Sequence, residues 1–265
     1  MRKVITAILL GVLVLAAVML LPRWGIYAIV IAMTVVGLIE FARMFLADPV
    51  ERASCIVAGL AMAVWMLGPP EWRNAASLGL VLVLFALSLI FMWRARELEG
   101  SAQRLGVALL GVVYVGIAFP FWAWIFELED GRSLVLLALV PACLCDVAGM
   151  IAGKLLGRHK LAPMVSPNKT IEGLIGALVG SFVGAFAVRF ALLPDVSALA
   201  VAGIAMVVWF TSPLGDLVES MFKRSCGVKD SGSIIPGHGG VLDRLDALVF
   251  TGPAAYAYVK YVIGM

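Results

Sequence analysis

A stretch of 27 residues near the C-terminal end, from Ser220 to Asp246, holds residue types suited to phosphate chemistry. It reads SMFKRSCGVKDSGSIIPGHGGVLDRLD, with cations and carboxylates on both sides of a glycine-rich turn. Carboxylates bind a hard divalent ion, Lys and Arg bind phosphate oxygens, and glycines let backbone N–H groups approach a ligand. This composition favours a site for a polyphosphate with its metal. A solvated loop whose lysines only set membrane topology is the alternative.

Helical spacing places acidic residues of this region on common faces. One helix is predicted to continue through Lys223, and its polar stripe has i, i+3, i+4 and i+7 spacing: Asp216, Glu219, Ser220 and Lys223. Asp243 and Asp246 share a face where the last helix begins. Carboxylates at membrane depth are costly and normally mark function, and Mg²⁺ needs only one or two of them beside phosphates and water. We therefore predict Mg²⁺ at Asp216 and Asp243, with polar helix caps as the alternative.

A second polar cluster begins with Asp146, whose apolar neighbours make its charge expensive unless it is paired or faces a wet cavity. The segment 166–170, SPNKT, is predicted to be turn-like, and Thr170 to Glu172 could open the next helix. Lys169 beside that helix start could hold a phosphate. Three further cations nearby are expected to attract anionic lipid heads: Lys154, Arg158 and Lys160.

The elements that must position these residues lie in a membrane. The chain has 265 residues, of which 63% are hydrophobic and 14% charged, whereas soluble domains are roughly 45–50% apolar. A soluble globular enzyme, a disordered chain and a disulfide-stapled secreted domain are excluded. The net charge of +3 is too small for a nucleic-acid binder. The apolar runs are continuous, whereas membrane strands alternate, so the expected fold is an all-α integral membrane protein.

Windows poor in charge predict about nine transmembrane helices. The predicted spans are Val4–Pro22, Gly25–Leu46, Ala53–Gly68, Ala75–Trp93, Gly106–Phe126, Ser133–Leu156, Leu174–Leu193, Ser197–Gly215 and Ala247–Met265. Fifteen of the 20 lysines and arginines then lie on the side of the N-terminus, which predicts a cytoplasmic N-terminus. We expect one polytopic domain over residues 1–265, with a helical scaffold at 1–132 and a catalytic half at 133–265. Glu40, within the second run, is expected to pair with a basic residue elsewhere.

The pattern between Ser220 and Asp246 resembles the signature of the phosphatidate cytidylyltransferase, or CDP-diacylglycerol synthase, family. Twelve fixed positions match: Ser220, Lys223, Arg224, Lys229, Asp230, Pro236, His238, Gly239, Gly240, Asp243, Arg244 and Asp246. The likeness extends upstream through Gly215-Asp216-Leu217 and the box from Ser166 to Gly173, as far as Asp146. The N-terminal half is similar only in hydropathy, length and span number. Ala148-Gly149-Met150 departs from the family, which often has an aromatic residue at the third position, and we expect only local packing to differ.

This resemblance implies conversion of CTP and phosphatidic acid to CDP-diacylglycerol and pyrophosphate at the cytoplasmic face of the inner membrane. It implies Mg²⁺, a second monovalent cation such as K⁺, and a homodimer. It makes Asp216 and Asp243 the metal carboxylates. The implied catalytic residues are Asp216, Lys223, Arg224, Lys229, Asp230, His238, Asp243, Arg244 and Asp246. The implied substrate-binding residues are Asp146, Ser166, Lys169, Thr170, Ser220, Gly239 and Gly240.

The role of His238 and two other functions of the protein stay open at this point. From its surroundings alone, His238 fits a proton donor, a phosphate ligand or a turn residue. A CTP-dependent polyprenol or lipid-alcohol kinase would use the same nucleotide, but it needs a base for its hydroxyl nucleophile and releases CDP. A membrane transporter predicts charges near the middle of the membrane and interrupted helices in both halves, whereas the polar residues here cluster at one interface.

Overall fold

Long apolar segments form helices here because backbone polar groups in hydrocarbon must pair within their own segment. The computed structural model describes residues 2–94, 98–232 and 239–264, with side chains from Gly11 onward. The N-terminal helices are α1 (Arg2–Leu20), α2 (Arg23–Phe45), α3 (Pro49–Leu67), α4 (Pro70–Asn74), α5 (Ala76–Arg94), α6 (Ser101–Gly111), the π-helix η1 (Val112–Ile117) and α7 (Phe121–Glu127). The C-terminal elements are α8 (Gly131–Leu156), β1 (Lys160–Ala162), β2 (Ser166–Thr170), α9 (Ile171–Leu192), α10 (Ala198–Ser225), α11 (Leu242–Tyr258) and the π-helix η2 (Val259–Ile263).

Within the described residues, seven helical segments are long and apolar enough to cross a membrane. They are α2, α3, α5, the continuous unit from α6 to α7, α8, α9 and α10. Each coincides with a predicted span, so the prediction of a multi-span helical membrane protein is confirmed. The first and last predicted spans fall on α1 and on α11 with η2, and neither is among the seven.

The polar residues that flank two apolar windows belong to the helices, as predicted. Helix α9 begins before its apolar window, and helix α10 extends beyond its own. Helix α10 continues through Lys223 and ends at Ser225, as predicted. Helix α9 begins at Ile171 after Thr170, whose hydroxyl accepts the Gly173 N–H at 3.0 Å as an N-cap.

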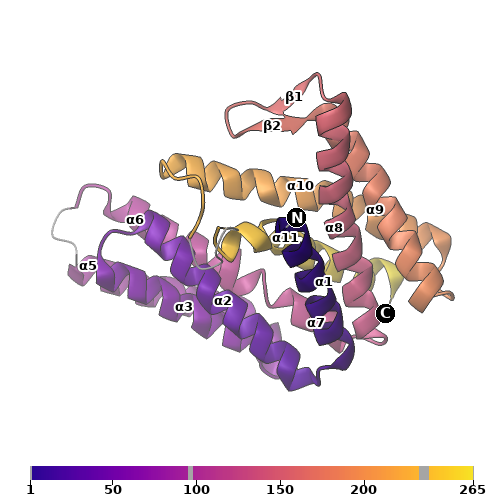
Figure 1. Ribbon diagram of the computed structural model, residues 1–265. Helices are drawn as coiled ribbons and strands as arrows, with labels where there is room; N and C mark the ends of the chain where they lie inside the picture. The colour runs from indigo at the N-terminus through magenta and orange to yellow at the C-terminus, as the bar shows by residue number, and fades with distance from the viewer. Residues whose placement is uncertain (1, 95–97, 233–238, 265) are drawn as a thin grey trace.

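The prediction of a turn at Ser166–Thr170 is wrong, because these residues form strand β2. It pairs antiparallel with β1, with Lys160 opposite Thr170 and Ala162 opposite Ser166. The paired strands form a hairpin that closes the shared end of α8 and α9 (Figure 1). The hairpin holds Lys169 beside the start of α9.

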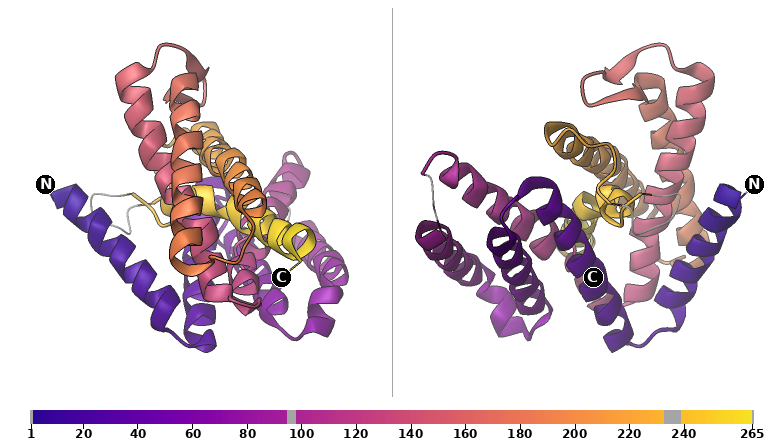
Figure 2. Two further views of the ribbon diagram at one scale, coloured as in Figure 1. Left: turned by 90° about the vertical axis from the view of Figure 1, so that its right-hand side faces the viewer. Right: turned by 60° about the vertical axis from the view of Figure 1, so that its left-hand side comes forward.

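The helices form two groups with α10 and α11 between them. Figure 2 shows α2, α3, α5 and α6 on one side and the adjacent α8 and α9 on the other. One large apolar core cluster draws buried residues from both halves of the chain, for example Phe41, Trp122, Leu137, Ile204 and Leu242. A smaller cluster joins α2, α3, α5, α6 and η1, with Cys55, Met62, Leu87 and Val112 among its members.

Glycines allow α8 and α9, the most extensively packed pair, to approach closely. A Cβ added at Gly180 would lie 2.3 Å from the carbonyl oxygen of Leu144 and 2.7 Å from the Ala148 Cβ. A backbone atom cannot move aside as a side chain can. Small residues at such contacts let membrane helices pack through their backbones, because no hydrophobic driving force acts between helices in lipid.

We expect Gly180→Leu to lower the free energy of unfolding by about 1–3 kcal/mol, because the new side chain would separate α8 from α9. Thermal unfolding of the detergent-solubilised protein measures this change. Gly106→Leu in α6 is the matched control, since a Cβ there meets no atom within 4 Å. Equal melting temperatures for the two variants would contradict the role of Gly180 in the contact between α8 and α9.

Candidate functional site

A cavity of about 870 Å³ lies where α8, α9, α10, α11 and the hairpin meet. Its volume is in the range of small-molecule binding sites. Eight charged residues are among those that line it: Asp146, Lys154, Lys160, Lys169, Asp216, Asp243, Arg244 and Asp246. The polar residues Ser166, Asn168 and Thr170 line it as well. The structure therefore brings residues from both polar clusters of the sequence into one site, including Asp146 and Lys169 from the first and Asp216 and Asp243 from the second.

The first contact in this site joins the hairpin to α10. Lys169 Nζ lies 2.7 Å from Asp216 Oδ2 and donates a hydrogen bond to the Pro213 carbonyl at 3.2 Å. Asp216 Oδ1 accepts a hydrogen bond from the Ser220 hydroxyl at 3.2 Å, one helical turn further. Both Lys169 and Asp216 remain partly exposed to the cavity. The pair leaves each group accessible to a ligand that could compete for it.

The second contact joins α10 to α11 through Lys223. Its ammonium lies 2.6 Å from Asp243 Oδ1 and also pairs with Glu219, one turn earlier on α10. Glu219 is fully buried and Lys223 is 9% exposed. Lys223 thus neutralises two carboxylates that would otherwise be buried without a counter-charge. It acts at the edge of the cavity, which its partner Asp243 lines.

The other oxygen of Asp243 organises the signature segment. Asp243 Oδ2 accepts hydrogen bonds from the Ser231 N–H at 3.0 Å, the Ser231 hydroxyl at 3.0 Å and the Gly240 N–H at 2.7 Å. A carboxylate that accepts several N–H bonds is held in one orientation and strongly favoured in its charged form. The two described ends of the segment, 231–232 and 239–240, are therefore tied to the start of α11.

Two further carboxylates of the cavity have few hydrogen-bond donors. Asp146 Oδ1 lies 3.4 Å from the Ser212 hydroxyl, and Asp246 Oδ1 accepts the N–H of the next residue, Ala247, at 2.7 Å. Both carboxylates also repel Asp216 electrostatically. The side chain of Asp146 is exposed and lines the cavity. This was expected, because a charge within an apolar helix costs free energy unless it faces water or a partner. Acidic groups in this arrangement favour the binding of a cation between them.

The donor set fits Mg²⁺ with a bound polyphosphate, although it is not a complete metal cage. Among the described residues, no three His, Cys, Asp or Glu side chains gather into a metal site. Mg²⁺ is commonly held by one or two carboxylates, with substrate phosphates and water in its other positions. The prediction that Asp216 and Asp243 bind Mg²⁺ is compatible with this chemistry and stays a prediction.

Several predicted site residues do not line the cavity. Ser220 and Lys223 act through Asp216 and Asp243, as described above. Gly239 and Gly240 lie against the Asp243 carboxylate. Three residues are exposed and are not among the cavity's lining residues: Arg224, Lys229 and Asp230. His238 lies outside the residues that the structure describes.

Two cations of the cavity were not predicted to belong to the site. Lys154 and Lys160, assigned to lipid-head attraction, line it from the end of α8 and from β1. Helix α8 places Lys154, whereas the place of Lys160 depends on the hairpin. Glu172 ties down the hairpin by accepting the Arg158 N–H at 3.1 Å and contacting His159 Nδ1 at 2.7 Å. No pattern in the sequence signals this pairing, because its partners are 13 and 14 residues apart across a hairpin.

The prediction that Glu40 pairs with a basic residue is wrong for the part of the chain described here. Its carboxylate instead accepts backbone N–H groups of Val241 and Leu242 at the start of α11, at 3.0 and 2.7 Å. The sequence does signal an unusual residue, because a lone carboxylate in an apolar run is costly. It cannot show which groups satisfy that carboxylate.

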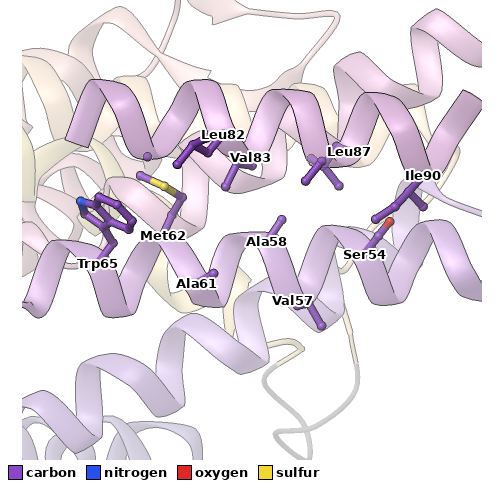
Figure 3. Close-up of a pocket in the computed structure, with 12 residues that line it drawn as sticks. Ser54, Val57, Ala58, Ala61, Met62, Trp65, Leu82, Val83, Leu87 and Ile90 are labelled. Atoms are coloured by element: carbon purple, nitrogen blue, oxygen red, sulfur yellow. The ribbon is translucent and has the colours of Figure 1, made fainter. Parts of the chain in front are cut away.

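A second cavity, of about 340 Å³, lies between α3 and α5 and has a different character (Figure 3). Its lining is apolar apart from the Ser54 hydroxyl, and Met62 and Trp65 close one end of it. It contains no charged lining residue, so it does not share the chemistry of the first cavity.

The fold and the site define a multi-span membrane protein whose charged cavity lies at one end of its helices, with cations and carboxylates suited to phosphate chemistry. The sequence matches the cytidylyltransferase family over residues 1–262. The chain belongs to this family.

Several relatives are named phosphatidate cytidylyltransferase. The chain is 40% identical over 146 residues to a phosphatidate cytidylyltransferase of Staphylococcus aureus strain COL, and this match covers 55% of each chain. The matched part is thus about half the length of that relative. Proteins of the same name from Staphylococcus haemolyticus and Staphylococcus epidermidis strain RP62A are 34% and 36% identical, over 75% of this chain and 76% of theirs.

Loss of the Lys223 ammonium should destabilise the fold. We expect Lys223→Met to lower the free energy of unfolding by about 3–5 kcal/mol, because Glu219 and Asp243 would both lose their counter-charge. Thermal unfolding in detergent measures the loss. The double variant Lys223→Met with Glu219→Gln should regain part of it, because one buried charge is then removed. A single variant that melts like the wild type would show that the pair is not needed.

Proposed function

We propose that this protein transfers a cytidylyl group from CTP to phosphatidic acid, forming CDP-diacylglycerol and pyrophosphate for phospholipid biosynthesis. The observation that carries the proposal is the cavity in which Lys154, Lys160 and Lys169 face the carboxylates of α8, α10 and α11. The family match and the activity for which its relatives are named support the same reaction.

The chemistry of the substrates explains why the cavity has this composition. A phosphate monoester has a second pKa of ~6, so phosphatidic acid is largely a dianion at neutral pH and needs no general base. One of its oxygens attacks the α-phosphorus of CTP, a new P–O–P bond forms, and the bond to the β-phosphate breaks with release of pyrophosphate. The main barrier is repulsion between anions, which cations and in-line positioning relieve.

Different residues of the cavity bind the phosphate groups and the cation. Lys154, Lys160 and Lys169 offer ammonium groups to phosphate oxygens, and Arg244 lines the same cavity. Thr170 places the start of α9, where backbone N–H groups favour anions, beside Lys169. Bound Mg²⁺, held by Asp216 and Asp243, would neutralise charge on the triphosphate and on pyrophosphate.

The remaining predicted partners are part of the proposal. Asp146 and Asp246 supply further negative charge for cation binding, where a monovalent cation such as K⁺ is also expected. Arg224, Lys229, Asp230 and His238 keep their predicted roles toward nucleotide or phosphate. The resemblance of the signature also carries the proposal of a homodimer.

We propose nine spans, with α1 as the first and α11 with η2 as the last, a cytoplasmic N-terminus and a site that faces the cytoplasm. The excess of Lys and Arg on that side of the chain supports this orientation. Residues assigned to the opposite side also contact one another: Glu127 pairs with Arg73 at 2.6 Å and with Arg23 at 2.9 Å. A site at the inner face would serve a lipid that stays in the bilayer and a nucleotide that stays in the cytosol.

The activity can be tested with purified protein in detergent, phosphatidic acid, Mg²⁺ and CTP labelled at the α- or the γ-phosphorus. The transferase puts the α-label into lipid and releases the γ-label as pyrophosphate. A lipid-alcohol kinase leaves phosphatidic acid unchanged and puts the γ-label into lipid only in a parallel reaction that supplies a lipid alcohol. A transporter modifies no substrate in either reaction. Wild-type protein that forms no CDP-diacylglycerol would overturn the proposal.

In the same assay we expect Asp243→Asn to reduce kcat by about 10²-fold or more, because charge stabilisation in the site is lost. Asp195→Asn is the control, since Asp195 is an exposed carboxylate in the connection between α9 and α10. Full activity in Asp243→Asn would remove Asp243 from the mechanism.

The orientation can be read from cysteine labelling. All four cysteines are free, and Cys226, directly after α10, is partly exposed. In a variant that keeps only Cys226, a membrane-impermeant maleimide should label inverted vesicles and not intact spheroplasts. A variant with Asp195→Cys as its only cysteine should show the reverse. The opposite pattern for the two variants would invert the proposed topology.

A further inference from the structure

Glu40 connects the N-terminal half of the chain to the signature segment. It lies on α2 and is 2% exposed. Its Oε1 accepts the Val241 N–H at 3.0 Å, and its Oε2 accepts the Leu242 N–H at 2.7 Å. The Ser231 hydroxyl is 3.1 Å from Oε2. Within the described parts of the chain, no cation pairs with this carboxylate.

These contacts satisfy the start of α11. The first N–H groups of a helix have no partner within the helix, and a negative charge beside them is favourable. Helix α11 begins at Leu242, and Val241, at its N-cap position, supplies no side-chain cap. Glu40 thus supplies from another helix the cap that the local sequence lacks.

Two glycines of the signature segment leave space for this carboxylate. A Cβ added at Gly232 would lie 2.4 Å from Glu40 Oε1, and one at Gly240 would lie 2.5 Å from Glu40 Oε2. Such distances are below any real contact, so a side chain at either position would displace Glu40. At positions 232 and 240, the absence of a side chain therefore leaves the space that the Glu40 carboxylate occupies.

Ser231 links Glu40 to Asp243. Its N–H donates to Asp243 Oδ2, and its hydroxyl lies 3.0 Å from that oxygen and 3.1 Å from Glu40 Oε2. The hydroxyl has one proton, so it donates to one carboxylate at a time, while the N–H holds Asp243 throughout. A shift of Ser231 would move the donors that orient Asp243.

We propose that Glu40 is a positioning residue for the reaction: it holds Ser231 and the start of α11 so that Asp243 faces Lys223 and the cavity. This inference rests on the proposed function, because it gives Asp243 a role in cation and phosphate binding. Glu40 itself touches no substrate. It makes the N-terminal half part of the catalytic machinery.

The test is Glu40→Gln, assayed for CDP-diacylglycerol formation over a range of Mg²⁺ concentrations. The amide keeps the shape but places an NH₂ group against backbone N–H donors. We expect a loss of about 10–100-fold in kcat and a higher Mg²⁺ concentration for half-maximal rate, as for residues that orient metal ligands. The matched control is Glu51→Gln, since Glu51 is a buried carboxylate of α3 that pairs with Arg104 at 3.0 Å, and it should leave both values unchanged.

A double-mutant cycle tests the contact itself. Gly232→Ala should lower activity in the wild type, because its Cβ would collide with Glu40, and it should have little further effect in the Glu40→Ala background. Additive effects of the two substitutions would show that residues 40 and 232 act independently and would overturn the inference.

The outcomes separate this inference from the proposed function. Wild-type protein without transferase activity overturns the proposed function. With active wild type, Glu40→Gln that keeps its kcat and Mg²⁺ dependence, or that loses thermal stability alone, overturns the role of Glu40. If Glu40→Gln does not fold, Ser231→Ala replaces it, and an unchanged Mg²⁺ dependence in that variant overturns the inference.

Discussion

The ammonium of Lys223, between the carboxylates of Glu219 and Asp243, is the interaction on which the site depends. A buried charge without a partner is strongly destabilising, so these three groups have to stay together. Because Lys223 and Glu219 lie on α10 and Asp243 lies on α11, the ion pairs determine how the two helices meet. The backbone donors of Ser231 and Gly240 then gather on the second oxygen of Asp243. The two described ends of the signature segment, at Ser231 and Gly240, are thus held by a carboxylate whose charge Lys223 neutralises.

The membrane explains why the remaining charges gather in one cavity. A carboxylate within an apolar helix is tolerated where it faces water or a counter-charge. Asp146, near the middle of the long helix α8, opens onto the cavity, and Asp216 meets Lys169 there. The carboxylates repel one another in the absence of a bound cation, whereas lysines of the hairpin stand opposite them. An arrangement of this kind favours a ligand that carries both a metal ion and phosphate groups.

Contacts join the two halves of the chain, so the N-terminal half is not a scaffold separate from a catalytic C-terminal half. The main apolar core draws on both halves, and Glu40 of α2 caps α11. The cap works because a carboxylate is a strong acceptor for unpaired N–H groups at a helix start. The glycines at positions 232 and 240 are needed for the same reason, since any side chain there would occupy the space of the carboxylate. The N-terminal half therefore contributes chemistry as well as hydrophobic packing.

Hydropathy was sufficient to predict seven helices long enough to cross a membrane, because the backbone in hydrocarbon has no other way to satisfy its polar groups. Local patterns were sufficient for the polar stripe of α10 through Lys223 and for the start of α9 near Thr170, because both depend on residues within two turns of one helix. Contacts between distant segments were not predictable in this way. The strand at Ser166–Thr170 exists because residues 160–162 pair with it, and the same hairpin places Lys160 at the cavity that Lys154 lines from the end of α8. Glu40 was visible as an anomaly, but its hydrogen-bond donors are backbone N–H groups about 200 positions away, which carry no signature of their own. The residues of the site thus follow from their types and spacing, whereas their pairing follows from which helices meet, and that is set by the packing and the ion pairs of the folded chain.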